Sequence, residues 1–423
     1  MSEGSPSHRL MPHGSETATQ GPGAAVLLAG AARLSITPDR PLELGGYAGR
    51  EFLSTGVLDP IHARALYVRR GTGGGVGDVC LVALDLIGLP VRYATAVREE
   101  VGAACGLPPE QVMLACSHTH AAPSGVDFVD AGRTDPGYLD ELRRTIVAAA
   151  HAAKERLEPV RVRSGEWEVH LTVNRRDAAT RSLPFGPTLA AGRIDPRARV
   201  LCFESAAGRP LAVVYHYAMH PVTLRNDNRL ISSDFPGVTS AALESCFTGA
   251  VALFLNGPAG DLVPRLVGGP PEMRVVGEAL AEAVAAALEA AAPVDAGEPG
   301  PALGAVRHLT LPAADPGMPA GMEIAVQALR LPGTTLVGLA GEPLLGLGQA
   351  IEVGLARRGR RPVWVVGFAN GCPGYLPTVE ACDQGGYEPV TSARYYNHPV
   401  LSHAVQSLVT RAAWDTAQAI GQG

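Results

Sequence analysis

The sequence contains little lysine, few aromatic residues and no excess of positive charge. Its 423 residues carry a formal net charge of −6. This balance leaves no basic surface for nucleic acid, so we expect no nucleic-acid partner. The seven cysteines are scattered, with no Cys-x-x-Cys pair. Their spacing favours neither a disulfide framework nor a cysteine-ligated zinc site.

Long hydrophobic runs are missing as well. No apolar segment reaches the roughly 20 residues needed to span a membrane without a glycine, proline or charge. The run at 24–32 is too short and follows no basic leader of the secretory kind, so we expect a cytoplasmic protein with no transmembrane segment. Residues 1–23 are rich in Ser, Gly, Pro, Thr and His. We expect them to form a disordered tail.

From residue 24 onward, strand-like and helix-like segments alternate. The pattern predicts strands at 24–32, 79–87, 112–116, 160–173, 251–255, 334–340 and 362–369, and helices at 91–105, 138–157 and 273–291. A stretch rich in Pro, Gly and acidic residues at 293–301 is the best candidate for an internal boundary. Because the candidate site residues lie on both sides of it, we expect residues 24–423 to act as one functional unit.

The most informative segment is Ser117-His118-Thr119-His120, which follows the predicted strand at 112–116. Side chains alternate along an extended strand, so two histidines one residue apart would point the same way. Imidazole is a preferred zinc donor. A pair of loop histidines without a metal is the alternative, and other ligands must be found elsewhere in the chain.

Three further strand ends carry groups that can bind a metal. His220 stands beside Pro221 at the end of a strand, whereas His216 lies inside that strand and is expected to be a core histidine. Glu342 lies at a strand-to-helix turn, where a helix dipole would also favour it. Tyr375 follows another strand among several Gly and Pro residues.

At this point the chain resembles the neutral, non-lysosomal ceramidases and their bacterial relatives. The resemblance extends from about Gly30 to the C-terminal helix and rests on landmarks in the same order. These are Gly30-Ala31-Ala32-Arg33, Thr37-Pro38, Gly45-Gly46-Tyr47, Ser117-His118-Thr119-His120, Val173-Asn174-Arg175, His220-Pro221-Val222, Ser233-Asp234, Ala259-Gly260-Asp261 with Pro264, Gly341-Glu342, and Tyr375 followed by Tyr387-Glu388. It implies the fold of the ceramidase N-terminal, catalytic domain: α/β, with mixed sheets and flanking helices.

The resemblance also implies roles for individual residues. It assigns the zinc ligands of the family to His118, His220, Glu342 and Tyr375. Three more positions match family residues that act on the substrate. His120 corresponds to a histidine that moves protons at the leaving group, Arg175 to an arginine near the substrate carbonyl, and Tyr387 to a tyrosine that points into the site.

A site of this kind has a clear chemical use. Zinc held by two histidines and a carboxylate can keep one position open for water and lower the pKa of that water to about 7. The water can then attack an amide or ester carbonyl. Asp234 and Asp261 are candidates to orient the imidazoles from behind, with ordinary surface turns as the alternative.

Two departures from the family bear on the substrate. The ceramidases carry a Ser-Asn pair before Ala-Gly-Asp, and here Gly257 replaces that serine. The chain also ends soon after the late tyrosine loop, without the immunoglobulin-like domain of the ceramidases. We therefore expect a zinc-dependent amidase acting on a small or medium-sized acyl substrate of specialised metabolism, which can be lipid-like but is not ceramide.

Alternatives to this function remain open at this stage. An esterase or lactonase could use the same zinc site, and a relative without activity could bind the ligand alone. Substrate choice is expected to depend on the loops at 127–135 and 225–229. The sequence predicts no oligomeric state.

Overall fold

The computed structural model describes residues 27–50, 52–71, 77–177, 192–295, 303–318, 321–360 and 362–420. The predicted tail at 1–23 lies outside the described residues, as do the start of the predicted first strand and most of the predicted boundary at 293–301. In the described parts of the chain, no helix is both long enough and apolar enough to cross a membrane.

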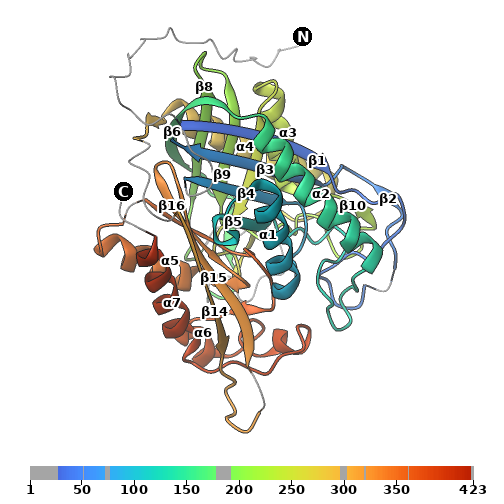
Figure 1. The fold of residues 1–423 in the computed structure, drawn as a ribbon. Coiled ribbons are helices and arrows are strands. Elements are labelled where there is room, and N and C mark those ends of the chain that lie inside the picture. Colours follow the sequence, from blue (N-terminus) through green and yellow to red (C-terminus); the bar gives the residue numbers. More distant parts are fainter. Residues whose placement is uncertain are drawn as a thin grey trace, which may run out of the picture.

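The larger of two main sheets has nine strands (Figure 1). Its order is β11 (Val251–Asn256), β9 (Pro210–Tyr217), β8 (Arg197–Ser205), β6 (Glu158–Glu168), β1 (Leu27–Ser35), β3 (His62–Arg70), β4 (Asp78–Leu84) and β5 (Val112–Cys116), and β13 (Ala292–Pro293) also pairs with β6. The two outermost pairs, β11–β9 and β4–β5, are parallel, and the pairs between them are antiparallel.

The second sheet has four strands, in the order β14 (Gly304–Leu311), β15 (Met322–Leu331), β16 (Thr334–Leu339) and β18 (Val363–Val366). Three short pairs complete the strand structure. They are β2 (Gly56–Val57) with β10 (Leu230–Ile231), β7 (Thr172–Asn174) with β12 (Leu262–Pro264), and β17 (Glu342–Pro343) with β19 (Tyr375–Leu376).

Helices cover the outer face of each sheet. Helices α1 (Val91–Cys105) and α2 (Pro136–Glu155) pack on one half of the large sheet, and α3 (Phe235–Cys246) and α4 (Pro270–Glu289) pack on the other half. Helices α5 (Leu345–Arg357) and α7 (Val405–Ala419) pack on the four-stranded sheet, as Figure 1 shows below the large sheet. The remaining elements are α6 (Val379–Gln384) and two 3-10 turns, Pro109–Gln111 and Thr391–Arg394.

The two sheets pack face to face between these helices. Along β3, Ala65 and Tyr67 belong to the core under the helices, whereas Leu66 and Val68 belong to a core that also contains Leu336 of β16. This alternation is the period of two expected for a strand buried on both faces. The result is a four-layer α/β/β/α arrangement, which confirms the predicted mixed sheets with flanking helices.

Individual elements follow the sequence pattern to different degrees. Helix α1 has the predicted bounds and ends at Gly106, whose φ of 68° is the left-handed conformation expected of a glycine C-cap. The single strand predicted at 160–173 is wrong. The chain leaves the large sheet after β6, and β7 pairs with β12 in a separate ribbon. Periodicity along the chain does not reveal such a change of partner.

A seam joins the two sheets next to the predicted site. The segment after β18 runs along the edge strand β5, where Cys116 N donates to the Phe368 carbonyl (3.1 Å) and Asn370 N donates to the Leu114 carbonyl (2.8 Å). These bonds lie immediately before His118. The end of β5 is therefore fixed by residues from the far end of the chain.

The packing of β1 against α2 gives a test of the fold. A Cβ on Gly30 would lie 2.1 Å from the Ala153 carbonyl oxygen. Because backbone rather than a mobile side chain is in the way, we predict that Gly30→Ala lowers the free energy of unfolding by about 3 kcal/mol. The midpoint of chemical denaturation measures this loss. Gly56→Ala is the control, since its nearest neighbour is the Leu230 Cδ2 at 3.4 Å. Equal midpoints for the two variants would contradict the packing described for Gly30.

Candidate metal centre

Three strand ends bring metal-binding side chains to one point. His118 follows β5, His220 follows β9, and Glu342 begins β17 just after β16. All three residues are at most 2% exposed. They follow strands of both main sheets, so the point at which they meet lies where the ends of these strands come together.

The two imidazoles are oriented by backbone carbonyls. His118 Nδ1 lies 2.6 Å from the Ile87 carbonyl oxygen, and His220 Nδ1 lies 2.6 Å from that of Ala259. A carbonyl only accepts, so each Nδ1 carries the proton and each Nε2 presents a lone pair. These Nε2 atoms lie 3.3 Å (His118) and 3.1 Å (His220) from Glu342 Oε2.

Three acceptor atoms therefore converge without a donor between them. His118 Nε2 and Glu342 Oε2 are buried and have no hydrogen bond within the described part of the chain, although they are close to each other. Buried polar atoms without a partner are costly, and a cation would satisfy them. A tetrahedral zinc ion with bonds of about 2.0 Å holds its donors roughly 3.3 Å apart. The observed spacing and donor types fit a divalent metal ion.

His118 reaches this position through an unusual backbone conformation. Its φ is +72°, so the residue is left-handed and not part of an extended strand. The predicted reason for the two histidines to point together was therefore wrong, although the rings of His118 and His120 do lie 5.0 Å apart between centroids. Phe368, also at positive φ, stacks on His118 at 4.0 Å and 18°. Such conformations concentrate at functional sites, where the surrounding packing maintains them.

His120 lies beside the pair. The donor nitrogens of His118, His120 and His220 are all within 4.8 Å of one another, which would allow them to share an ion. Both ring nitrogens of His120 are buried without a partner in the described chain. Burial, followed by the two neighbouring histidines, lowers the pKa of His120 well below its usual value. The imidazole is therefore neutral at physiological pH.

Glu342 is held from two sides. In the parallel pair β17–β19 it lies directly opposite Tyr375, and its Oε1 accepts a hydrogen bond from the Tyr396 hydroxyl. Burial alone would raise the pKa of this carboxyl. Positive charge on the adjacent His118 and His220 would outweigh burial and hold that pKa well below its ordinary range, so this carboxylate is stabilised by positive charge at this point.

Arg175 reaches the site from the end of β7. Its Nη2 donates to the Tyr375 hydroxyl (3.0 Å) and the Gly260 carbonyl (2.8 Å), while Nε donates to Glu388 (2.8 Å). Burial works against the charge, but Tyr375 and Glu388 raise the pKa of Arg175 above its usual value. The Tyr387 ring lies 5.7 Å from Tyr375, and the Arg175 guanidinium lies 5.4 Å from the Tyr387 ring.

Most of these side chains line a small cavity of about 30 Å³, although His220 and Arg175 are not among its described lining residues. Its volume suits one or two water molecules rather than a whole substrate. The predicted loop at 127–135 contributes to it, whereas no residue of 225–229 lines it. The described lining comprises Gly46, Ala48, Ile87, His118, His120, Phe128, Ala131, Glu342, Tyr375, Tyr387, Tyr395 and Tyr396.

Two sequence predictions about supporting residues fail. Asp261 accepts from Leu345 N and Asn174 Nδ2, and Asp234 accepts from Leu224 N and neighbouring groups, so neither orients an imidazole. Both aspartates are buried, which also excludes a surface-turn role. Backbone carbonyls take the orienting role instead, and a sequence pattern does not reveal them.

Two other positions explain features of the sequence. His216 is a core histidine, as expected, with Nε2 2.9 Å from the Val365 carbonyl oxygen. A Cβ on Gly257 would lie 2.8 Å from the Ala218 Cβ and 3.0 Å from the His216 ring. A side chain at position 257 would therefore point into the buried packing around Ala218 and His216. The residue is absent from the described lining of the 30 Å³ cavity.

Several residues of the site had no role predicted from the sequence. Tyr396 supports Glu342, Phe368 stacks on His118, and the Tyr47 ring lies 4.9 Å from that of His120. Glu388 anchors Arg175. The aromatic pair Tyr395-Tyr396 was a possible signal, since aromatic residues are scarce in this chain.

Comparison with known proteins agrees with this fold. The sequence model of the neutral/alkaline non-lysosomal ceramidase family, N-terminal, matches residues 28–278. The chain is 27% identical over 231 residues to the neutral ceramidase of Pseudomonas aeruginosa, covering 52% of this chain and 34% of that protein. It is also 27% identical over 156 residues to neutral ceramidase A of Dictyostelium discoideum, covering 35% and 22%. The aligned parts thus span about a third or less of these curated relatives.

The structural likeness is more extensive than the sequence likeness. The crystal structure of the Pseudomonas aeruginosa neutral ceramidase superposes with a TM-score of 0.78 at 21% identity, covering 94% of this chain and 76% of that one. The molecule is thus a protein of the neutral ceramidase fold. With more than half of its residues matched by the family model, the chain belongs to the neutral/alkaline non-lysosomal ceramidase family.

The hydrogen bond from Tyr396 to Glu342 gives a test of the centre. We predict that Tyr396→Phe weakens metal binding 10- to 100-fold, because supporting bonds of this kind fix the ligand and adjust its basicity. Competition with a chromophoric chelator measures the affinity. Tyr93→Phe is a matched control, since the Tyr93 hydroxyl donates to the Leu139 carbonyl (2.6 Å) and lies outside the cavity lining. Unchanged affinity in Tyr396→Phe would remove this residue from the account.

Proposed function

We propose that this protein is a zinc-dependent hydrolase that uses water to cleave the amide bond of an N-acyl substrate. The observation that carries the proposal is the convergence of two imidazole lone pairs on one carboxylate oxygen in a buried, donor-free position. Two histidines and a glutamate form a donor set that catalytic zinc sites use. The relatives named neutral ceramidase support an amide as the bond that is cleaved.

In this proposal His118, His220 and Glu342 would hold the zinc ion, with Tyr375 as a further ligand. When bound, the ion would supply the Lewis acidity that lowers the pKa of a coordinated water to about 7. We further propose that residues 24–423 act as one catalytic unit, since the described ligands lie on both sides of the stretch at 293–301. Zinc suits imidazole and carboxylate donors in a site that also admits water, and hydrolysis needs no change of oxidation state at the metal.

The other side chains have separate tasks. As water adds to the carbonyl carbon, negative charge develops on the carbonyl oxygen. Arg175 and Tyr387, which adjoin Tyr375, would stabilise that charge. His120 would pass a proton to the nitrogen of the departing amine as the carbon–nitrogen bond breaks. Its unpartnered imidazole would take that proton from the attacking water, so the proton lost by the water is the one gained by the amine.

The proposed substrate is a small or medium-sized acyl compound, and this class includes lipid-like amides. Part of the sequence argument against ceramide rested on Gly257, and that position packs against Ala218 and His216. The presence of Gly257 in place of the family serine therefore gives no structural reason to exclude ceramide. Ceramide belongs in the substrate panel. Esters and lactones belong there too, because the same centre could hydrolyse them.

Metal removal tests the proposal directly. We predict that the purified protein contains about one zinc ion per chain, and that chelation abolishes hydrolysis of an acyl-amide panel until zinc is restored. His118→Ala and Glu342→Ala should each lose the ion and nearly all activity, because each removes a donor. His403→Ala, a change at an exposed histidine paired with Asp383, should keep both. Stoichiometric zinc without turnover of any amide or ester would indicate a binding protein instead.

His120 requires a separate experiment, because its nitrogens are close enough to share the ion. We predict that His120→Ala retains the zinc ion and lowers kcat by about 10²- to 10⁴-fold, the usual contribution of a proton-transfer group. Metal content and kcat must be measured on the same preparation. Loss of zinc in this variant would make His120 a ligand and contradict its proposed role.

A further inference from the structure

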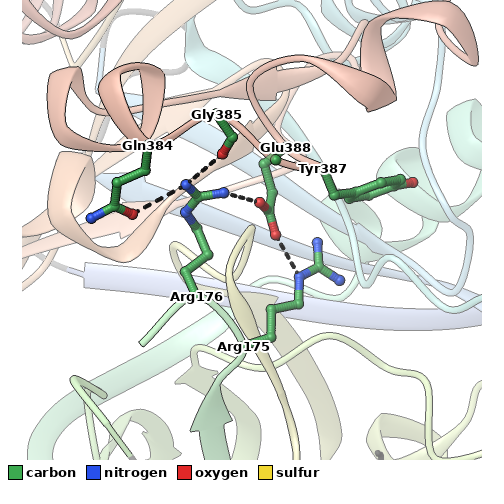
Figure 2. Close-up of a pocket in the computed structure, with 7 residues that line it drawn as sticks. Arg175, Arg176, Gln384, Gly385, Tyr387 and Glu388 are labelled. Atoms are coloured by element: carbon green, nitrogen blue, oxygen red, sulfur yellow. Dashed lines mark hydrogen bonds and ion pairs between the residues drawn. The ribbon is translucent and has the colours of Figure 1, made fainter. Parts of the chain in front are cut away.

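A second, larger cavity adjoins the candidate metal centre. It has a volume of about 560 Å³ and is formed by Arg175, Arg176, Tyr387 and Glu388 with the turn at 384–386 (Figure 2). We call it the arginine pocket. Tyr387 lines both this pocket and the 30 Å³ cavity. The volume of the arginine pocket is within the usual range for ligand sites, so the pocket can receive the part of a substrate next to the reacting bond.

One of the two arginines has a structural task. Arg176 pairs with Glu388 through Nη1, and its Nη2 donates to the Gly385 carbonyl (2.9 Å) and to Gln384 Oε1 (3.3 Å). Figure 2 shows the guanidinium of Arg176 enclosed by these acceptors. Arg176 thus fixes the turn that forms one wall of the pocket.

Arg175 is committed only in part. Its Nε donates to Glu388 and its Nη2 to Gly260 and Tyr375, whereas Nη1 donates to no residue in the described chain. The side chain is 26% exposed. Glu388, itself 4% exposed, holds the guanidinium in place from one side. A donor nitrogen of Arg175 therefore remains available to a ligand in the pocket that this residue lines.

The charges of the pocket do not cancel. Two guanidinium groups face one carboxylate, which leaves one positive charge among the described lining residues. None of those residues has an aliphatic side chain. An anionic group would neutralise the excess charge and accept from Arg175 Nη1.

We infer that the arginine pocket binds a carboxylate on the amine side of the substrate, so that the preferred substrates are N-acyl amino acids. This inference rests on the proposed function. A hydroxyl group could also accept from Nη1, but it carries no charge, so only a carboxylate adds the attraction of opposite charges to the hydrogen bond. The charge therefore favours a carboxylate over the neutral hydroxyl of an amino alcohol.

The first experiment uses the unmodified zinc-loaded protein and two probes. N-octanoylglycine and N-octanoylethanolamine share their acyl chain and amide, and they differ in whether a carboxylate or a hydroxyl lies on the amine side. We predict that kcat/KM for the glycine amide exceeds that for the ethanolamine amide by about tenfold or more. Hydrolysis of both with equal efficiency, or a preference for the ethanolamine amide, would overturn the inference and leave the proposed function intact.

The second experiment locates the preference. Arg175→Gln removes the charge, and the ratio of the two kcat/KM values should fall to about one even if both values drop. The ratio is informative because a general loss of catalysis cancels in it. Arg209→Gln is the matched control, since Arg209 forms an exposed pair with Glu158 and lines no part of the pocket; it should retain the preference. A preference that persists in Arg175→Gln would place the carboxylate elsewhere.

The proposed amidase function and the proposed carboxylate preference can fail separately. If the zinc-loaded protein hydrolyses neither probe nor any other amide, the proposed amidase function fails, and the inference fails with it. If Arg175→Gln does not fold, the comparison of probes on the unmodified protein still decides the question.

Discussion

The structure depends on the placement of three buried acceptors around one point. His118 Nε2, His220 Nε2 and Glu342 Oε2 cannot satisfy one another, because each offers a lone pair and none offers a proton. Leaving such groups unpaired inside a protein is unfavourable by several kcal/mol. A divalent cation at this point would remove the cost. The hydrogen bonds and packing around this point hold the three acceptors in place despite that cost.

The fold meets this requirement by joining strand ends that are distant in sequence. The two histidines follow strands of the large sheet, and Glu342 and Tyr375 lie in the β17–β19 pair, which follows strands of the second sheet. The seam between β5 and the segment after β18 fixes the two sheets beside the centre. The backbone of His118 and the stacked Phe368 adopt positive φ, so packing holds the site in a conformation that the residues would not choose alone.

Much of this architecture could be predicted from the sequence. The strand at 112–116 follows from a continuous apolar run, and helix α1 follows from apolar positions mixed among Arg and Glu with Gly106 as its C-cap, because these signals are local. The candidate ligands could be proposed as groups at separate strand ends. Their contacts could not, because the β17–β19 pairing, the Ile87 and Ala259 carbonyls and the Tyr396 hydroxyl depend on tertiary packing. For the same reason, the predicted conformation of His118 and the predicted roles of Asp234 and Asp261 were wrong.

The measurement that tests the central claim most directly is anomalous diffraction at the zinc absorption edge, using crystals of the full chain grown with zinc. The account predicts one strong peak within bonding distance of His118 Nε2, His220 Nε2 and Glu342 Oε2. A peak bonded to other residues, or no peak at this position in zinc-saturated crystals, would contradict it.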